Sequence, residues 1–196
     1  MAALYHRDTL RLFPTLVGTF AIDAPAQLAA LAREVLARAD TAATRADGAA
    51  WRSANDLLSW SPATRAIGDW IGEAVTTLVP DDGDASDAGV YLTAWATVVR
   101  AGEHVAPHAH ADAAWTGALY LDAGDSDDRH GGRLALRDPR AGAGMVESAT
   151  SRFAAACTAH HTPRTGELVV FPAWVLHWVE PYQGARPRIS VGFGAR

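Results

Sequence analysis

Two segments in the first half of the chain repeat apolar residues at intervals of three and four, which is the spacing of one face of a helix. The apolar positions of residues 24–40 are Leu28, Leu31, Val35 and Leu36. Residues 61–80 carry the same pattern, and there Ser61 is a suitable N-cap before Pro62 at the first helical position. Pro80 is expected to end this helix. We therefore predict two amphipathic helices, each with one buried face.

From residue 90 onward the pattern changes to short runs of β-branched and aromatic residues, separated by Gly, Pro and Asp. A polar turn segment at 81–89 divides the two patterns. The predicted strands are residues 90–100, 116–121, 133–137, 167–171, 175–180 and 188–193. This order predicts an α+β protein whose helices pack against a β-sandwich or barrel. We expect one domain over residues 1–196, mainly helical at 1–85 and with a β-barrel core at 86–196.

Composition and charge narrow the choice of partners. The net charge is −5, and the 17 basic residues are scattered without forming a stripe, which argues against nucleic acid. The single cysteine, Cys157, cannot form an intramolecular disulfide. Residues 1–16 lack the pattern of a signal peptide, and no run of 18 apolar residues predicts a membrane span. We expect a cytoplasmic protein that acts on a small molecule, with a homodimer as the candidate assembly.

A histidine-rich segment is the first indication of chemistry. Residues 102–117, GEHVAPHAHADAAWTG, hold His104, His108, His110 and Asp112 within nine positions. In a strand, residues i and i+2 point to the same face, so His108 and His110 can direct two imidazoles to one point. A polar strand end is the alternative interpretation of this pair. A third ligand from elsewhere would distinguish a metal site from that alternative.

His177 is the best-placed third ligand. It lies in the apolar, tryptophan-rich segment GELVVFPAWVLHWVEP (166–181), where a single histidine is more often a hydrogen-bonded core residue. Two ligands from one strand and one from a distant strand are nevertheless a common metal-binding arrangement in small β-barrels, and they leave coordination positions open. Arg188 and Ser190 follow on another predicted strand and share a face. A guanidinium beside a hydroxyl is a suitable seat for a carboxylate.

These segments together resemble the iron(II)/2-oxoglutarate-dependent oxygenases, specifically a short bacterial group of that family. The similar segments are LFPT (12–15), WRS (51–53), NDLLSW (55–60), HAHADAAWTGALYL (108–121), GGRLALRDPR (131–140), GELVVFPAWVLHWVEP (166–181) and RPRISVGF (186–193). The last two segments are the most specific. The resemblance implies a double-stranded β-helix, a jelly-roll or cupin-like barrel, with the N-terminal helices packed against it.

The resemblance also implies the roles of the site residues. His108 and His177 would bind Fe(II). Arg188, helped by Ser190, would hold the distal carboxylate of 2-oxoglutarate, whose 2-oxo acid end chelates the metal. The hydroxyl of Tyr120 could reach the same carboxylate from its strand. The implied reaction uses O₂ to oxidise a small molecule, by default through hydroxylation, and converts 2-oxoglutarate to succinate and CO₂.

The middle metal ligand departs from the usual family pattern, in which an Asp or Glu follows the first histidine at i+2. Here that residue is His110, so we predict the metal set His108, His110 and His177. The pair His110 and Asp112 is the alternative, since it restores a carboxylate to the set. Because His110 fills the position that chloride would need, we predict no halogenation.

Some predictions concern other residues and other classes of protein. The pocket is expected to include aromatic residues, with Trp95, Trp115 and Trp174 as candidates after Tyr120. The remaining histidines are predicted to be loop residues without a catalytic role: His104, His130, His160 and His161. The histidine spacing also fits a cupin, although the glutamate expected a few residues after His110 is missing. A binding barrel without a metal is the third possibility.

Overall fold

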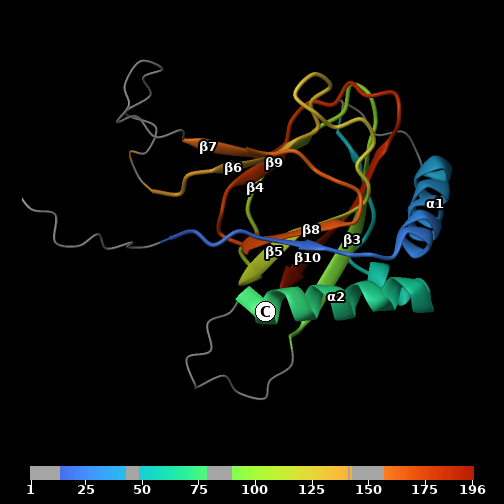
Figure 1. Ribbon diagram of the computed structural model, residues 1–196, viewed down its shortest axis with the longest axis horizontal. Coiled ribbons are helices and arrows are strands. Elements are labelled where there is room, and N and C mark those ends of the chain that lie inside the picture. The colour runs from blue at the N-terminus through green and yellow to red at the C-terminus, as the bar shows by residue number, and fades with distance from the viewer. Residues whose placement is uncertain (1–13, 43–48, 79–89, 141, 143–156) are drawn as a thin grey trace, which may run out of the picture.

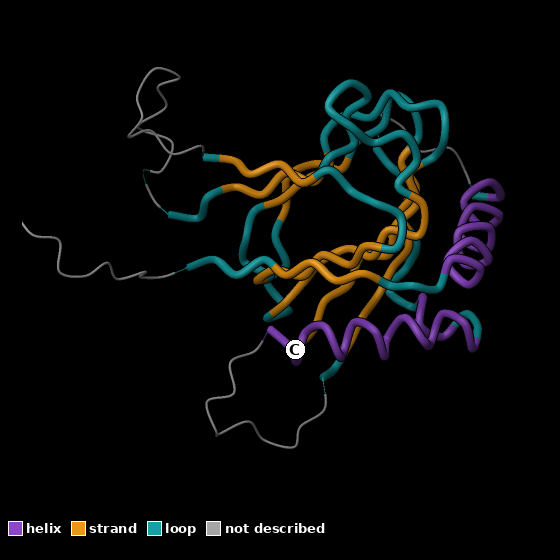
Figure 2. Tube along the Cα trace, in the orientation of Figure 1, coloured by secondary structure: helices purple, strands orange, loops and turns teal. Residues whose placement is uncertain are grey.

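The computed structural model describes residues 14–42, 49–78, 90–140, 142 and 157–196. Two helices, α1 (Pro25–Thr41) and α2 (Pro62–Leu78), lie on the outer side of one layer of strands (Figures 1 and 2). A short 3-10 turn, η1 (Leu57–Ser59), precedes α2. No helix among these residues is long and apolar enough to cross a membrane.

The strands form two antiparallel sheets. The larger sheet has the order β1-β8-β5-β10-β3-β2, and the smaller sheet has the order β4-β9-β6-β7. Members of the larger sheet are β1 (Gly18–Ala21), β2 (Trp51–Arg52), β3 (Leu92–Val99), β5 (Trp115–Asp122), β8 (Glu167–Pro172) and β10 (Arg188–Ala195). Members of the smaller sheet are β4 (Val105–His108), β6 (Leu134–Arg137), β7 (Thr158–His161) and β9 (His177–Val179). Most neighbouring strands in the sheets are not consecutive along the chain, as in a jelly-roll.

The predicted start of the second helix is confirmed by its hydrogen bonds. The backbone N–H of Thr64 donates to Oγ of Ser61 over 3.2 Å, and the backbone N–H of Ser61 donates to Oγ1 of Thr64 over 3.0 Å. This reciprocal pair satisfies two backbone donors that a helix start leaves open. Pro62 follows at the position where a missing N–H costs nothing. Pro80 and the predicted turn at 81–89 lie outside the described residues.

The larger sheet is buried on both faces, and each face has a different partner. Its outward apolar side chains pack with those of α1 and α2 into the main core, which includes Leu31, Ile71, Val98, Leu119, Val191 and Phe193. Its inward side chains form a second cluster with residues of the smaller sheet, and this cluster includes Tyr120, Leu134, Val169 and Phe171. The alternation of side chains along each strand therefore separates the helix-facing core from the space between the sheets.

The six predicted strands are present, but four shorter strands were missed. β1 and β2 lie within the part predicted to be mainly helical, and they pair with β8 and β3. β4 contains a proline, and β7 is the polar run TAHH, so neither carries an apolar alternation. The prediction that His160 and His161 are loop residues is therefore wrong, because both lie in β7. Pairing with β6, rather than their own sequence, makes these residues a strand.

The helix-facing core makes a prediction about stability. Ile71 is fully buried in the main core, whereas Glu73 on the same helix is exposed. We expect Ile71→Ala to lower the free energy of unfolding by about 2–5 kcal/mol because it leaves a cavity. The matched Glu73→Ala variant should change it by less than about 0.5 kcal/mol. Urea unfolding followed by circular dichroism measures both, and equal values would contradict this packing.

Candidate metal centre

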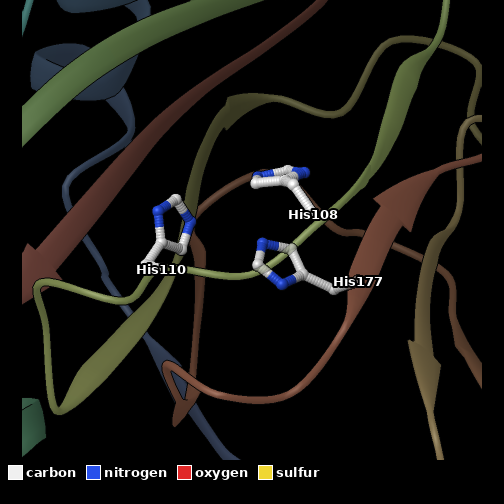
Figure 3. A group of neighbouring side chains, drawn as sticks. All are labelled: His108, His110 and His177. Atoms are coloured by element: carbon white, nitrogen blue, oxygen red, sulfur yellow. The ribbon is translucent and has the colours of Figure 1, made fainter.

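Three histidines from two distant segments meet between the sheets. His108 ends β4 and His177 begins β9, and these two residues are directly paired across the smaller sheet. His110 follows β4 by two residues. One ligand atom of each histidine lies within 4.8 Å of the others, and Figure 3 shows the three rings side by side. The ring centroids of His108 and His177 are 4.3 Å apart. The ring centroid of His110 lies 5.0 Å from that of His108 and 5.3 Å from that of His177.

The predicted convergence of His108 and His110 is present, but the predicted reason for it is wrong. β4 ends at His108, so the two residues do not share the face of a strand. His110 lies two residues beyond the strand, where its backbone N–H donates to the carbonyl of Ala173 over 3.0 Å. That hydrogen bond ties the segment after β4 to the residue that follows β8, and the ring of His110 lies near the other two rings.

Two of the histidines are oriented by their own backbone. Nδ1 of His108 lies 2.8 Å from the carbonyl oxygen of Ala106, and Nδ1 of His177 lies 2.9 Å from that of Val175. Since a carbonyl only accepts, Nδ1 carries the proton in each ring and Nε2 keeps a lone pair. These hydrogen bonds fix the tautomer that a metal needs.

The charge state of the cluster also suits a metal. Burial lowers the pKa of His177 to about 4, and burial together with the neighbouring His108 lowers the pKa of His110. Both shifts favour the neutral form of His177 and His110, which is the form that coordinates a metal. Neutral imidazole nitrogen is a suitable ligand for Fe(II) and other divalent first-row ions. The donor set thus fits the ion that the sequence predicts.

Asp112, the alternative middle ligand, lies outside the cluster. Its side chain is exposed, and the group of potential ligand atoms contains His110 instead. Asp112 acts on His110 only through its charge, which raises the pKa of that histidine against the larger effect of burial. The geometry therefore favours His110 over Asp112 as the middle ligand.

The residues predicted to seat a carboxylate lie together on β10 and β5. Arg188, Ser190 and Tyr120 are all buried, with exposed fractions of 1%, 4% and 0%. Nη1 of Arg188 lies 3.4 Å from Oγ of Ser190, and its Cζ lies 4.9 Å from the centroid of the Tyr120 ring. Ser190 and Tyr120 are paired across the two strands. The three predicted residues therefore occupy one site.

This seat has unsatisfied polar atoms. Nε of Arg188 and the hydroxyl of Tyr120 are buried and have no hydrogen-bond partner among the residues that the structure describes. Among the described residues, no carboxylate forms an ion pair with Arg188. Burial lowers the pKa of this arginine, yet a guanidinium stays charged under physiological conditions. A buried cation without a counter-charge is costly, so the arrangement fits an anionic ligand that enters from outside.

The three histidines, Arg188 and Ser190 line the same cavity, which has a volume of about 460 Å³. Trp95 also lines it, with its ring centroid 5.3 Å from that of His110, whereas Trp115 packs towards the helices and Trp174 is 56% exposed. Of the three candidate tryptophans, Trp95 alone faces the cavity. Sequence reasoning missed Arg52 and placed His104 in a loop without a role, yet both line this space.

Comparison with known proteins identifies the family. Residues 93–194, more than half of the chain, match the family model described as "Putative 2OG-Fe(II) oxygenase". The chain therefore belongs to the 2-oxoglutarate- and Fe(II)-dependent oxygenases, as its sequence predicts. No curated protein matches the chain in sequence.

Solved structures show the same fold at low sequence identity. A prolyl-4-hydroxylase of Pseudomonas putida is 18% identical, with a TM-score of 0.62 over 92% of this chain and 91% of that one. HygX of Streptomyces hygroscopicus, with nickel and 2-oxoglutarate bound, is 13% identical, with a TM-score of 0.63 over 92% and 82%. SnoN, a 2-oxoglutarate-dependent epimerase from nogalamycin biosynthesis, is 15% identical, with a TM-score of 0.65 over 92% and 77%. The predicted double-stranded β-helix is confirmed.

The assignment of the metal ligands generates a direct prediction. We expect His110→Ala and His177→Ala each to lower Fe(II) affinity by more than about 100-fold, because losing a ligand exceeds the roughly 10–100-fold effect of losing a supporting residue. Asp112→Ala is the matched control and should retain nearly all the affinity. Fe(II) titration under anaerobic conditions measures all three. Loss of binding in the Asp112 variant with retention in the His110 variant would reverse the assignment.

Proposed function

We propose that the protein oxidises a small molecule with O₂ and that His108, His110 and His177 hold the Fe(II). The observation that supports this proposal is one cavity with two complementary parts, namely a cluster of three histidines and a buried arginine that forms no ion pair among the described residues. The first part suits a divalent metal, and the second suits the far carboxylate of 2-oxoglutarate. When bound, Fe(II) and 2-oxoglutarate supply oxidation of a C–H bond by O₂, with conversion of 2-oxoglutarate to succinate and CO₂.

The residues of the chain bind, orient and shield the reactants. Arg188 would bind the distal carboxylate of 2-oxoglutarate, and the hydroxyls of Ser190 and Tyr120 would donate hydrogen bonds to the same carboxylate. The Tyr120 hydroxyl suits this role because burial raises its pKa, which keeps the phenol protonated and able to donate. Apolar side chains that line the cavity, Phe171 and Val179 among them, would exclude water from the reacting groups.

Hydroxylation is the proposed outcome, because it needs only a C–H bond placed near the metal. The related folds include a prolyl-4-hydroxylase and an epimerase, so the fold itself does not choose between reactions. With His110 as the middle ligand, no position is left for chloride, and halogenation is not proposed. A cupin that does not use 2-oxoglutarate would not need Arg188 to bind a carboxylate. A homodimer and a cytoplasmic location stay predictions.

The role of Arg188 can be tested by binding. We expect Arg188→Ala to weaken 2-oxoglutarate binding by at least about tenfold, because a charge-assisted contact is lost, while Fe(II) affinity stays nearly the same. The visible charge-transfer band of the anaerobic Fe(II) protein with 2-oxoglutarate measures this. Ser190→Ala, which removes the weaker partner, should have a smaller effect. An Arg188 variant that folds and binds 2-oxoglutarate like the parent would exclude this role.

The reaction itself can be tested without the natural substrate. The protein incubated with Fe(II), 2-oxoglutarate, ascorbate and O₂ should form succinate slowly, because these enzymes turn over 2-oxoglutarate without substrate at a low rate. His108→Ala should abolish this activity. Succinate is measured by mass spectrometry. If the well-metallated protein transforms a substrate without consuming 2-oxoglutarate, the cupin alternative would replace the proposal.

A further inference from the structure

The three histidines of the metal centre are not held in the same way. Nδ1 of His108 and Nδ1 of His177 each form a hydrogen bond with a backbone carbonyl, which fixes the orientation of the ring. In the described part of the chain, His110 forms a hydrogen bond only through its backbone N–H, which donates to the carbonyl of Ala173. The side-chain torsion χ2 of histidine has broad preferences, so a fixed backbone does not by itself fix the ring. The orientation of the third ring therefore depends on its packing.

Trp95 of β3 provides the packing surface for this ring. The ring centroids of Trp95 and His110 lie 5.3 Å apart, and the ring planes are inclined at 43°. Among the described residues, the other aromatic rings in contact with His110 are those of His108 and His177, which are themselves candidate ligands. Trp95 is 8% exposed and lines the cavity, so its indole forms a fixed wall beside the third ligand.

Trp95 is itself confined by residues on both neighbouring strands. Gly192 of β10 is paired with Trp95, and a Cβ added at Gly192 would lie 2.6 Å from Nε1 and 2.7 Å from Cε2 of the indole. Non-bonded heavy atoms pack best at about 3.5–4.0 Å, so any larger side chain at position 192 would displace the indole. On β2, Cζ of Arg52 lies 4.3 Å from the centroid of the Trp95 ring. The missing side chain at Gly192 thus determines where Trp95 can lie.

We propose that Trp95 is a positioning residue for the third metal ligand, and that Gly192 provides the space in which the indole does this. The inference rests on the proposed function, because it takes His110 as a ligand of Fe(II). Residues that support a metal-binding histidine usually do so through a hydrogen bond to its second ring nitrogen. At His108 and His177 a backbone carbonyl has this role, whereas at His110 the indole has it. Loss of the indole should therefore disturb one ligand of the three.

The first test measures metal affinity in variants of Trp95 by anaerobic Fe(II) titration, with circular dichroism to show that each variant is folded. We expect Trp95→Leu to lower the affinity about 10–100-fold, which is the range for loss of a residue that supports a ligand. Trp95→Phe keeps an aromatic ring beside His110 and should lose less.

Phe171→Leu is the matched control for the loss of an aromatic ring in the cavity. It removes a ring whose centroid lies 4.9 Å from that of His177, but His177 keeps its hydrogen bond to the carbonyl of Val175. Because that ligand has a second support, the Fe(II) affinity should fall by less than in Trp95→Leu.

The second test displaces the indole without changing it. Gly192→Ala should lower Fe(II) affinity in the same range as Trp95→Leu, because the added methyl group moves the indole away from His110. In a protein that already carries Trp95→Ala, the same change should have little further effect, since the ring that it would displace is gone. Gly194→Ala is the control on the same strand, where the added Cβ would lie 3.3 Å from its nearest neighbours. This variant should bind Fe(II) nearly as well as the parent.

A spectroscopic measurement shows which ligand is disturbed. Co(II) is used as the probe metal, and the proton NMR spectrum of the Co(II) protein contains shifted N–H signals from each bound ring. The ring N–H protons of His108 and His177 are hydrogen-bonded and should exchange slowly with water, whereas that of His110 should exchange faster. In Trp95→Leu we expect the two slowly exchanging signals to keep their positions and the third to shift or broaden.

The outcomes separate this inference from the function on which it rests. A folded Trp95→Leu protein that binds Fe(II) like the parent, with all three ring signals unchanged, would overturn the role of Trp95 and leave the proposed function intact. Equal disturbance of all three signals would indicate a general effect on the fold and would overturn the role as well. If Trp95→Leu does not fold, Trp95→Phe and Gly192→Ala allow the same comparison. A parent protein that binds no metal through the three histidines would contradict the proposed function, and this inference with it.

Discussion

The two-residue repeat of side chains along the central strands of the larger sheet is the constraint on which the site depends. On β10, Ile189, Val191 and Phe193 belong to the core that α1 and α2 cover, whereas Arg188, Ser190 and Gly192 line the cavity. A shift of one residue in the pairing would exchange these two sets. It would put a guanidinium into the helix-facing core and fill the cavity with branched apolar side chains. The packing of the helices on one face thus fixes the chemistry of the other face.

Long elements with strong patterns could be predicted from the sequence, and short ones could not. The helices and the six main strands carry apolar patterns of their own, so they can be predicted from the local sequence. β4 and β7 are strands because they pair with neighbouring strands. Their sequences, VAPH and TAHH, carry no pattern from which this pairing could be predicted. His108 and His177 were predicted as ligands from the spacing of the first histidine pair, from the apolar strand around His177 and from the family resemblance. Their direct pairing depends on the register of β4 against β9, which is a property of the folded sheet.

The site residues that sequence reasoning missed show the same limit. Arg52 is one of many scattered arginines in the sequence, and only the pairing of β2 with β3 brings it to the cavity. His110 was predicted from a shared strand face, but it lies beyond the end of β4, where its backbone N–H donates to the carbonyl of Ala173. Residue types indicate which chemistry a chain can support. The contacts between distant segments decide which residues take part in it.

The hydrogen bonds of His108 and His177 have a consequence for how the protein acquires its metal. Each ring is held by the carbonyl of the residue two positions earlier in its own chain, and the main core lies on the far face of the larger sheet. The backbone therefore contributes to the orientation of two ligands, and the main core contains none of the three histidines. The residues of this core and those that would bind the ion are separate, in contrast to small domains that fold only around their metal. Selection among divalent ions would then depend on the ligand type, the geometry and the metals available, because imidazole suits several of them.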